Sequence, residues 1–376
     1  MAELSEVQAR LGALGRPYTT ADVAQVLREM DEVVTDAAML QTMERLRRNS
    51  TGAGPLEELL RSPNVTDVVV NGPRNVFVDR GRGLERAPVT FVDDEQVRRL
   101  AIRLAAAAGR RLDDAQPFVD GKLADGTRLH AVLAPIAEPG TCLSLRVPAR
   151  RNFSLVGLVN AGSVSAQGAE LLRRLMLRKA PFLISGGTGS GKTTLLAALL
   201  AEVPHSERLL VVEDARELTP DHPHCVRLEG RAANAEGAGA ITMTDLIRQA
   251  LRMRPDRVVL GEVRGGEITD LLRALNTGHE GGCATIHANS VADVPARLEA
   301  LAALGGLGRE ACHSQVAAAL RLVIHVGRGP SGKRRVEEIG AVVRDGNFVR
   351  IEPGLGWAPT GWARLPGAHL VEELLC

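Results

Sequence analysis

The sequence predicts an α/β fold in its C-terminal half, where helices cover a mainly parallel sheet, and a smaller α+β domain ahead of it. Three observations support this prediction. Strand and helix patterns alternate beyond residue 168, and Asn-Gly and Asp-Gly turns separate short β-rich runs between residues 55 and 147. A glycine-rich loop also joins an apolar strand to an apolar helix within residues 181–202. At 376 residues the chain is long enough for two such domains and a small appendage.

Composition restricts the class of protein. Hydrophobic residues make up 45% and charged residues 24% of the chain, as in ordinary globular proteins. The net charge of +1 provides no overall field that would attract nucleic acid or an anionic membrane. Five dispersed cysteines without a C-x-x-C pair argue against a disulfide framework or a four-cysteine zinc site. No signal peptide or bilayer-spanning segment is evident, so we expect a cytoplasmic protein, able to dock on a membrane partner.

The first part of the chain is predicted to contain helices followed by a small domain. Residues 1–54 carry helical patterns at "ADVAQVLREMDEVV" and "AAMLQTMERLRR" and end in a Ser/Gly/Pro linker. Residues 55–147 read as an α+β domain with strands at "VTDVVVNG", "NVFVDRG" and "CLSLRVP". Its helix, "DDEQVRRLAIRLAAAAG", is expected to have Asp93 or Asp94 as its N-cap. The Asp-Gly pair in "GKLADGTRLHAVLAP" indicates a hairpin.

The second part is predicted to hold the larger domain. Residues 148–168 have weak periodicity and are interpreted as an interdomain linker. Residues 169–351 form the α/β domain, in which strands "PFLISG", "RLLVVED", "RVVLGE" and "CATIHA" alternate with helices over 192–202, 244–254 and 265–276. Later strands within 322–351 are expected to extend its sheet. Residues 352–376 read as a loosely ordered tail.

A phosphate-binding loop is predicted at residues 186–193, where "GGTGSGKT" matches the pattern G-x-x-x-x-G-K-[ST] between a strand and a helix. Backbone N–H groups of such a loop and the positive end of the helix dipole suit phosphate oxygens. The pattern places Lys192 at the β- and γ-phosphates and the Thr193 hydroxyl on Mg²⁺. Only four of the 46 basic residues are lysine, so a lysine here stands out. The expected nucleotide-binding residues are Gly186, Gly187, Thr188, Gly189, Ser190, Gly191, Lys192, Thr193 and Thr194.

Carboxylates follow two of the predicted strands. Glu262 ends "VVLGE" and is expected to hold or polarise the attacking water and to contact Mg²⁺, directly or through water, with Thr193. Glu213 and Asp214 follow the apolar run in "LLVVEDARE". A single carboxylate after a strand is usually a solvated strand end, but two of them beside a phosphate loop favour catalysis.

The stretch "TGHEGGCATIHANS" at residues 277–290 permits three interpretations. A zinc site would need His279, Glu280 and Cys283 on one helical face, and the intervening Gly-Gly pair disfavours a helix. A switch strand would use His279 and His287 to hydrogen-bond a γ-phosphate or a neighbouring subunit, which fits the phosphate loop better. Ordinary structural hydrogen bonds are the third interpretation.

Four blocks in this order and spacing resemble the secretion ATPases of type II, type IV pilus and type IV secretion systems. They are "GGTGSGKTT", "VVEDARELTP", "ALRMRPDRVVLGEVRGGE" and "NTGHEGGCATIHANS", which correspond to that family's Walker A, Asp box, Walker B and His box. The Tad/Flp pilus branch (TadA/CpaF-like) is most similar. The resemblance extends upstream through "DDAQPFVDGKLADGTRLHAVLAP" and covers roughly residues 55–350.

This resemblance implies a hexameric ring that holds ATP and Mg²⁺ between a PAS-like N-terminal domain and a RecA-like C-terminal domain. It makes Glu262 the Walker B glutamate, Glu213 part of the Asp box, and His279 and His287 the His-box pair. Arg128 and Arg146 lie where the family has arginines that reach nucleotide phosphates. The implied output is pilus assembly or protein secretion through an inner-membrane platform protein, with the ring at the inner face of the membrane.

Two other functions stay open. A nucleic-acid motor of the conjugation type would use a similar ring, although the near-zero net charge and 2% aromatic content are atypical of single-strand channels. A non-catalytic, nucleotide-gated scaffold would bind ATP without turnover, and the carboxylates Glu213 and Glu262 argue against it.

Overall fold

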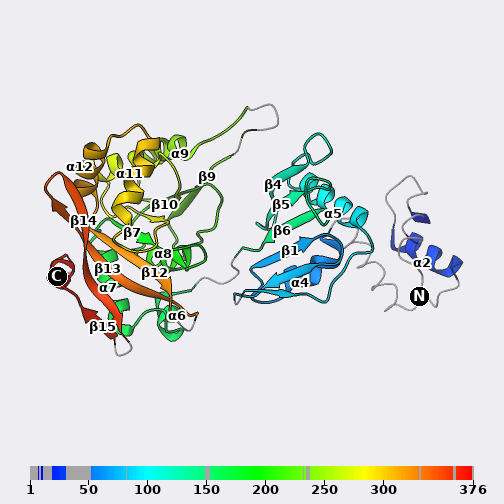
Figure 1. The fold of residues 1–376 in the computed structure, drawn as a ribbon, viewed down its shortest axis with the longest axis horizontal. Helices are drawn as coiled ribbons and strands as arrows, with labels where there is room; N and C mark the ends of the chain where they lie inside the picture. Colours follow the sequence, from blue (N-terminus) through cyan, green and yellow to red (C-terminus); the bar gives the residue numbers. More distant parts are fainter. Residues whose placement is uncertain are drawn as a thin grey trace. The chain divides into compact units, whose positions relative to one another are not determined.

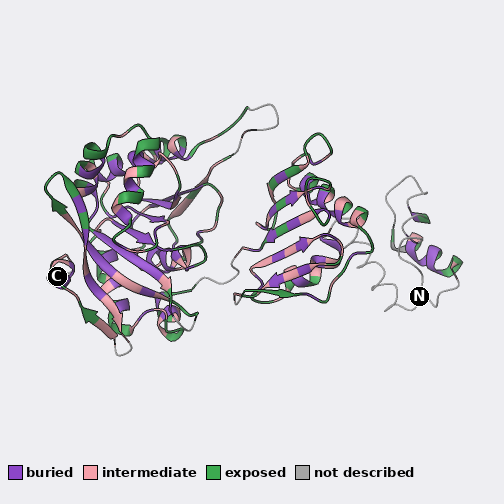
Figure 2. Ribbon diagram, viewed as in Figure 1, coloured by how far each residue is buried: buried purple, intermediate pink, exposed green. Residues whose placement is uncertain are grey.

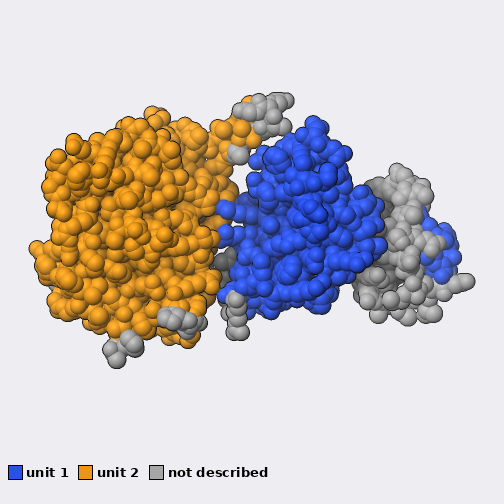
Figure 3. Space-filling model, viewed as in Figure 1, with its two compact units in different colours: residues 1–148 blue, residues 149–376 orange. Residues whose placement is uncertain are grey.

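In a computed structural model of the chain, the described residues are 7, 10–11, 19–30, 52–81, 83–148, 153–231, 233, 238–329, 332–358 and 361–374. The chain divides into two compact units, Met1–Pro148 and Ala149–Cys376 (Figures 1 and 3). Within the described residues, no helix is both long and apolar enough to cross a membrane.

The first predicted helix near the N-terminus is present as α2 (Thr20–Glu29). Thr19 caps it, and the Thr19 and Asp22 side chains accept hydrogen bonds from each other's backbone N–H groups. The second predicted helix, over residues 37–48, lies outside the described residues.

Unit 1 contains the predicted α+β domain. Its sheet has the order β3-β2-β1-β6-β5-β4, and each neighbouring pair is antiparallel. Helix α5 begins after Asp93, whose side chain accepts from the Gln96 N–H, so the predicted cap is confirmed. The predicted hairpin is also confirmed, because β4 and β5 flank the Asp125–Gly126 turn. The elements are η1 (Gly54–Leu56), α4 (Glu57–Arg61), β1 (Asp67–Asn71), β2 (Val76–Asp79), β3 (Leu84–Arg86), α5 (Asp94–Ala107), β4 (Phe118–Lys122), β5 (Arg128–Val132) and β6 (Cys142–Arg146).

Unit 2 is built on one large sheet with the order β15-β14-β13-β12-β7-β11-β10-β8-β9. The block from β12 to β9 is parallel, and β13 to β15 extend it as antiparallel strands. The prediction that strands within residues 322–351 extend the sheet is confirmed, although their antiparallel pairing and β15 were not predicted. The strands are β7 (Phe182–Ser185), β8 (Leu209–Glu213), β9 (Cys225–Glu229), β10 (Arg257–Val263), β11 (Cys283–Ile286), β12 (Leu322–Arg328), β13 (Arg334–Asp345), β14 (Phe348–Ala358) and β15 (Gly361–Arg364). The helices are α6 (Leu155–Asn160), α7 (Ala166–Leu177), α8 (Lys192–Leu200), α9 (Met243–Ala250), η2 (Leu251–Met253), α10 (Ile268–Asn276), α11 (Val294–Leu304), α12 (Arg309–Ala319) and α13 (Ala368–Glu373).

The central strands of unit 2 are buried on both faces (Figure 2). Phe182 and Ile184 face a core formed with α6, α7, α8 and α13, whereas Leu183 faces a second core formed with α9 to α12. This two-sided burial explains why these strands read as continuous apolar runs. Because neighbouring strands here are parallel, the carboxyl ends of β7, β11, β10 and β8 lie along one edge of the sheet.

The segment predicted as a linker, residues 148–168, is partly helical. Helix α6 buries Leu155 and Leu158 in the core of unit 2, and α7 begins at Ala166. Ser154 and Ser165 cap these helices by accepting hydrogen bonds from backbone N–H groups. Serine is common in both linkers and helix N-caps, and the sequence interpretation chose the wrong one.

The segment predicted as a loose tail, residues 352–376, is instead packed onto unit 2. Strand β14 continues to Ala358, β15 pairs with it, and α13 buries Ala368 and Val371. Trp362 lies so close to α7 that a Cβ added at Gly168 would lie 2.2 Å from its Nε1. The glycines of "GLGWAPTGW" made this segment look irregular, because close backbone approach and disorder favour the same residue.

Candidate functional site

The predicted phosphate loop lies between β7 and α8, at the carboxyl edge of the sheet. It follows strand residues that are buried on both faces, and α8 begins at Lys192. Gly186 adopts φ 154°, and a Cβ there would lie 2.3 Å from the Val326 carbonyl oxygen and 2.6 Å from Ser190 Oγ. Only glycine fits this position. Gly187, Thr188 and Gly189 form the exposed lip of the loop, and Thr193 and Thr194 lie half-buried in the first turn of α8.

Lys192 is folded against this loop. Its Nζ donates hydrogen bonds to the carbonyl oxygens of Gly186 and Gly187, both at 2.9 Å, and its side chain is 6% exposed. Burial lowers the pKa of the ammonium, and the nearby Arg264 charge acts in the same direction, while Glu262 opposes both. The structure therefore holds a partly desolvated cation inside a ring of backbone groups.

A chain of contacts runs from Lys192 through His287 to Glu262 at the end of β10, and Arg264 binds the far side of Glu262. His287 follows β11, and its Nε2 lies 3.5 Å from Lys192 Nζ and 2.5 Å from Glu262 Oε1. The other carboxylate oxygen of Glu262 accepts from Arg264 Nε at 2.5 Å. Burial and the Lys192 charge lower the pKa of His287 even though Glu262 acts to raise it. Because a carboxylate oxygen can only accept, the His287 ring donates to Glu262 at the shorter distance.

Glu213 lies on the neighbouring strand β8 and packs over β10. A Cβ added at Gly261 would lie 2.5 Å from Glu213 Cγ, so the glycine before Glu262 makes room for the second carboxylate. Glu213 Oε1 accepts from the N–H groups of Glu217 and Leu218. Burial raises the pKa of Glu213 to about 7, and this effect outweighs those two hydrogen bonds.

Two buried oxygens at this edge have no hydrogen-bond partner among the described residues, namely Glu213 Oε2 and Ser190 Oγ. Most buried polar atoms in proteins are paired, and exceptions concentrate where a ligand or catalysis needs them. A glycine-restricted loop, a buried lysine and an unpaired serine hydroxyl together fit a phosphate-bearing ligand, whereas an ionised carboxylate oxygen would repel phosphate. Hydroxyl and carboxylate oxygens at Thr193 and Glu262 are also of the type that Mg²⁺ prefers.

The two predicted His-box histidines are not brought together in this unit. His279 lies in the turn before β11 and His287 directly after it, so the strand separates them by roughly 13 Å at 3.3 Å per residue. His279 therefore does not reach the phosphate loop of its own unit. Cys283 is buried within β11, and no group of three His, Cys, Asp or Glu residues among the described residues could hold a metal ion. The zinc interpretation gains no support.

Arg128 and Arg146 lie in unit 1. They are direct cross-strand neighbours on β5 and β6, and Lys122 on β4 is opposite Arg128. The three cations thus form one row on a single face of the sheet, because paired residues of antiparallel strands share a face. Their predicted reach toward nucleotide phosphates stays a prediction.

Sequence reasoning missed Arg264, which binds Glu262, although it lies only two residues downstream in "GEVRGGE". It also missed Arg328 and Arg334, which contact the phosphate loop from the hairpin of β12 and β13. No local pattern marks the latter two, because they lie 139 and 145 residues beyond Gly189 in the sequence.

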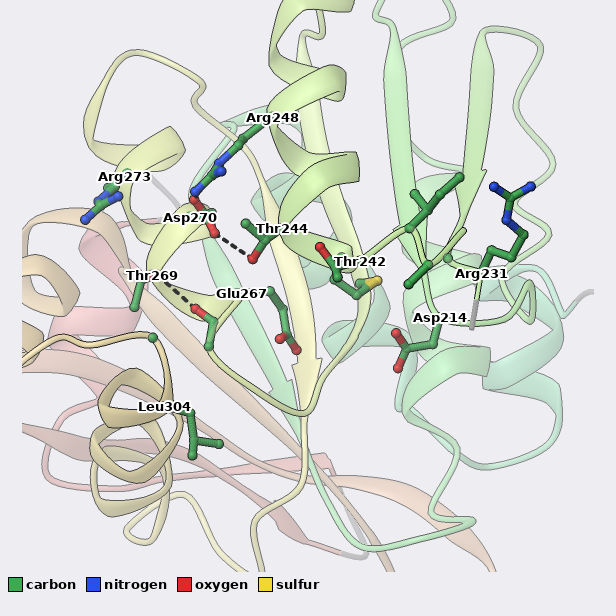
Figure 4. Close-up of a pocket in the computed structure, with 16 residues that line it drawn as sticks. Asp214, Arg231, Thr242, Thr244, Arg248, Glu267, Thr269, Asp270, Arg273 and Leu304 are labelled. Carbon is green, nitrogen blue, oxygen red and sulfur yellow. Dashed lines mark hydrogen bonds and ion pairs between the residues drawn. The ribbon is translucent and has the colours of Figure 1, made fainter. Parts of the chain in front are cut away.

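Unit 2 also contains a cavity of about 770 Å³ between α9, α10 and the end of α11 (Figure 4). Thr244 donates to Asp270 at 2.9 Å, and Arg248 forms an ion pair with the same carboxylate. Glu267 accepts from two backbone N–H groups, and Asp214 and Arg231 lie at the opposite side in the view. Because Lys192, Glu213 and Glu262 are not among its lining residues, this cavity is separate from the phosphate loop.

The chain is similar in sequence to known proteins. The family described as "Type II/IV secretion system protein" matches residues 49–342. A Mycobacterium tuberculosis protein (strain H37Rv) named for conjugal transfer is 55% identical over 315 residues, which is 82% of this chain and 89% of the relative. The type IV secretion system protein VirB11 of Brucella suis is 32% identical over 301 residues, covering 72% of this chain and 82% of that protein.

Solved structures show the same mixed α/β fold. The Yersinia pseudotuberculosis ATPase DotB has a TM-score of 0.54 at 17% sequence identity, over 86% of this chain and 81% of that one. The pilus retraction motor PilT, solved with bound ADP, has a TM-score of 0.50 at 17% identity and 82% coverage of both chains.

Proposed function

Because the chain belongs to the type II/IV secretion system protein family, we propose that it is an ATPase motor that powers pilus assembly or protein secretion through a membrane platform protein. The observation that supports this most strongly is the linked set of Lys192, His287 and Glu262 beside a glycine-restricted loop. A buried cation and a held carboxylate at one loop are what phosphoryl transfer requires, because that chemistry depends on positioning and charge stabilisation.

The loop would bind the phosphates of ATP. Its backbone N–H groups and the first turn of α8 supply positive dipole ends, and Lys192 supplies a full charge. Lys192 now donates to two loop carbonyls, so phosphate binding would exchange these neutral acceptors for anionic ones. That exchange strengthens the hydrogen bonds and offsets the cost of keeping the ammonium buried.

Glu262 would orient the attacking water and accept its proton. The water oxygen bonds to the γ-phosphorus while the bond to the bridging oxygen breaks, and ADP leaves with that electron pair. His287 and Arg264 hold both oxygens of Glu262, so the carboxylate is oriented before substrate binds. Because the pKa of Glu213 is raised to about 7, this side chain would add a negative charge near Glu262 above that pH and none below it.

Mg²⁺ would be held by the Thr193 hydroxyl and, through water, by Glu262. When bound, it supplies positive charge across the phosphate oxygens. Thr193 lies in the first turn of α8 directly after Lys192, so the two side chains approach the phosphates from one helix end.

We further propose that unit 2 is RecA-like, that unit 1 is PAS-like, and that six chains form a ring. The segment 1–54 and the domain 55–147 are proposed with the predicted bounds, and the larger domain is proposed to take in the packed elements from α6 to α13. In such a ring Arg128 and Arg146 would contact nucleotide phosphates, and His279 would act toward a neighbouring chain. The Tad/Flp branch is the proposed lineage, on the strength of the sequence blocks.

The test is steady-state ATP hydrolysis of the purified chain against protein concentration, with light scattering to measure particle mass. We expect activity to rise as a particle of about six times the chain mass of 40.0 kDa assembles. Lys192→Ala should abolish turnover. Hydrolysis at the unsubstituted rate by that variant would overturn the site assignment.

A second function is a nucleic-acid-translocating motor, which the conjugal-transfer name of the 55% identical relative favours. The same assay separates the two proposals. Hydrolysis that depends on added single-stranded DNA supports the nucleic-acid motor, and hydrolysis indifferent to DNA supports the secretion motor.

A further inference from the structure

The hairpin of β12 and β13 reaches the phosphate loop from the same unit. Arg334 Nε donates to the carbonyl oxygen of Gly189 at 2.8 Å, and Arg328 Nη2 approaches the same oxygen at 3.4 Å. Both arginine side chains also pack closely against the glycines of the loop. A Cβ added at Gly189 would lie 3.5 Å from Arg328 Nη2, and one added at Gly191 would lie 3.5 Å from Arg334 Cδ. Two cations therefore converge on one peptide group of the loop.

This contact fixes the orientation of one peptide plane. A trans peptide is planar, so its C=O and the following N–H point in opposite directions. Because the Gly189 carbonyl points out to the arginines, the Ser190 N–H points into the loop, where it donates to the Gly187 oxygen at 3.3 Å. The interior of the loop is where phosphate oxygens would be bound, and an inward N–H is the donor they need.

We propose that Arg334, assisted by Arg328, is a positioning residue that keeps the Ser190 N–H turned into the phosphate loop. This inference rests on the proposed nucleotide-binding function and adds the same-unit hairpin to its machinery. The arginines act on the peptide plane through Gly189 and add positive charge at the exposed lip. The strand that carries Arg328 also supplies the Val326 carbonyl against which Gly186 packs, so the hairpin contacts the loop at two places.

A positioning role predicts an effect on nucleotide binding rather than on chemistry. Losing a charge-assisted hydrogen bond at an exposed carbonyl should weaken ADP binding and raise the KM for ATP by about three- to tenfold. The value of kcat should stay within about twofold, because Lys192 and Glu262 are untouched.

The experiment compares Arg334→Gln, Arg328→Gln and Arg334→Lys with a matched control, Lys333→Gln. Lys333 is exposed on the same hairpin, so its substitution removes a neighbouring charge of the same sign. ADP affinity is measured by calorimetry, and KM and kcat by steady-state hydrolysis. We expect the largest loss for Arg334→Gln, a smaller one for Arg328→Gln, partial recovery for Arg334→Lys, and no change for Lys333→Gln.

The outcomes separate this inference from the proposed function. If the unsubstituted chain binds no ADP, the nucleotide site and this role are both overturned. If it binds ADP, Lys192→Ala abolishes turnover, and Arg334→Gln and Arg328→Gln match the unsubstituted protein, only the role of the arginines is overturned. An equal loss from Lys333→Gln would also overturn it, because general charge rather than the Gly189 contact would explain the effect.

Discussion

Charged side chains are buried at both ends of the parallel sheet in unit 2, but the two groups differ in how completely they are paired with hydrogen-bond and ion-pair partners. At the amino end, Arg257 is 1% exposed and donates to Glu207 at 2.7 Å and to the Met176 carbonyl oxygen at 2.6 Å. Lys179 lies 3.4 Å from the other Glu207 oxygen. This cluster is compensated by partners on three segments.

At the carboxyl end the compensation is incomplete. Glu213 Oε2 and Ser190 Oγ are buried without partners among the described residues, and Lys192 is held by neutral carbonyls. One strand, β10, begins at Arg257 in the first environment and carries Glu262 in the second. The Arg257–Glu207 cluster is therefore satisfied and stabilises the fold, whereas the cluster around Lys192 is only partly satisfied, as a ligand site would be. Two buried nitrogens near the amino end, Arg208 Nε and His279 Nδ1, also have no partner among the described residues, so the contrast is between these two clusters and not between whole edges of the sheet.

The largest expected effect is on chemistry at the carboxyl end. Glu262→Gln should lower ATP turnover about a hundredfold or more, because an amide cannot accept the proton from water. Stability should change little, since the amide oxygen still accepts a hydrogen bond. Steady-state hydrolysis and urea unfolding measure the two effects. Glu202→Gln, at the Arg173 ion pair, is the control. Near-normal turnover of Glu262→Gln would remove Glu262 from the mechanism.

At the amino end the expected effect is on stability. Arg257→Met should lower the free energy of unfolding by about 3–5 kcal/mol, because among the described residues it leaves the buried Glu207 with Lys179 as its remaining ion-pair partner. Activity per folded molecule should not change. Urea unfolding monitors the loss, and the double variant Arg257→Met with Glu207→Leu should recover part of it. A loss below about 1 kcal/mol would show that this cluster does not stabilise the fold.

The Glu213 pKa predicts a pH dependence of unusual sign for a carboxylate. Its folded-state pKa is raised from 4.5 to about 7, so between these values the folded state holds a proton that the unfolded state has released. This group's contribution is therefore fully present below about pH 4.5 and is lost as pH rises through about 7. Because one pKa unit corresponds to about 1.36 kcal/mol, the free energy of unfolding should fall by about 3 kcal/mol over this range.

Glu213→Gln should remove this slope. The measurement is urea unfolding of both proteins at pH 4.5 and pH 8, and the difference between them should change by about 3 kcal/mol across that range. Titrating groups that do not interact with Glu213 cancel in the comparison. A difference that does not vary with pH would place the raised pKa elsewhere.

The residues at the carboxyl end of the sheet could be predicted from the sequence, but those at the amino end could not. The loop pattern, its flanking strand and helix, and carboxylates after apolar runs predicted where the phosphate loop, Glu213 and Glu262 lie. Arg257 carried no signal, because an arginine at the start of a strand reads as a surface residue, and its partner Glu207 lies 50 residues away. The contact of Arg334 with Gly189 was missed for the same reason, because the two residues lie 145 positions apart in the sequence. Local patterns encode the elements, whereas pairing between distant segments depends on packing.

The smallest expected effect compares two serines at the phosphate loop. Ser185 and Ser190 are both buried, but the Ser185 hydroxyl lies 2.9 Å from His325 Nδ1, whereas Ser190 Oγ has no partner among the described residues. Ser185→Ala should therefore cost about 1–2 kcal/mol of stability, because it breaks a buried hydrogen bond. Ser190→Ala should stabilise the fold by about 0.5–1 kcal/mol, because it removes an unsatisfied hydroxyl.

Ser190→Ala should also weaken ADP binding about two- to threefold if the unpaired hydroxyl serves the ligand. Thermal or urea unfolding of the two alanine variants, with ADP titration of each, gives both quantities. Opposite signs in stability would show that the carboxyl edge gives up fold stability for a ligand contact. Equal losses from both variants would mean that Ser190 Oγ has a partner in solution, and the contrast between the two ends of the sheet would then rest on Glu213 alone.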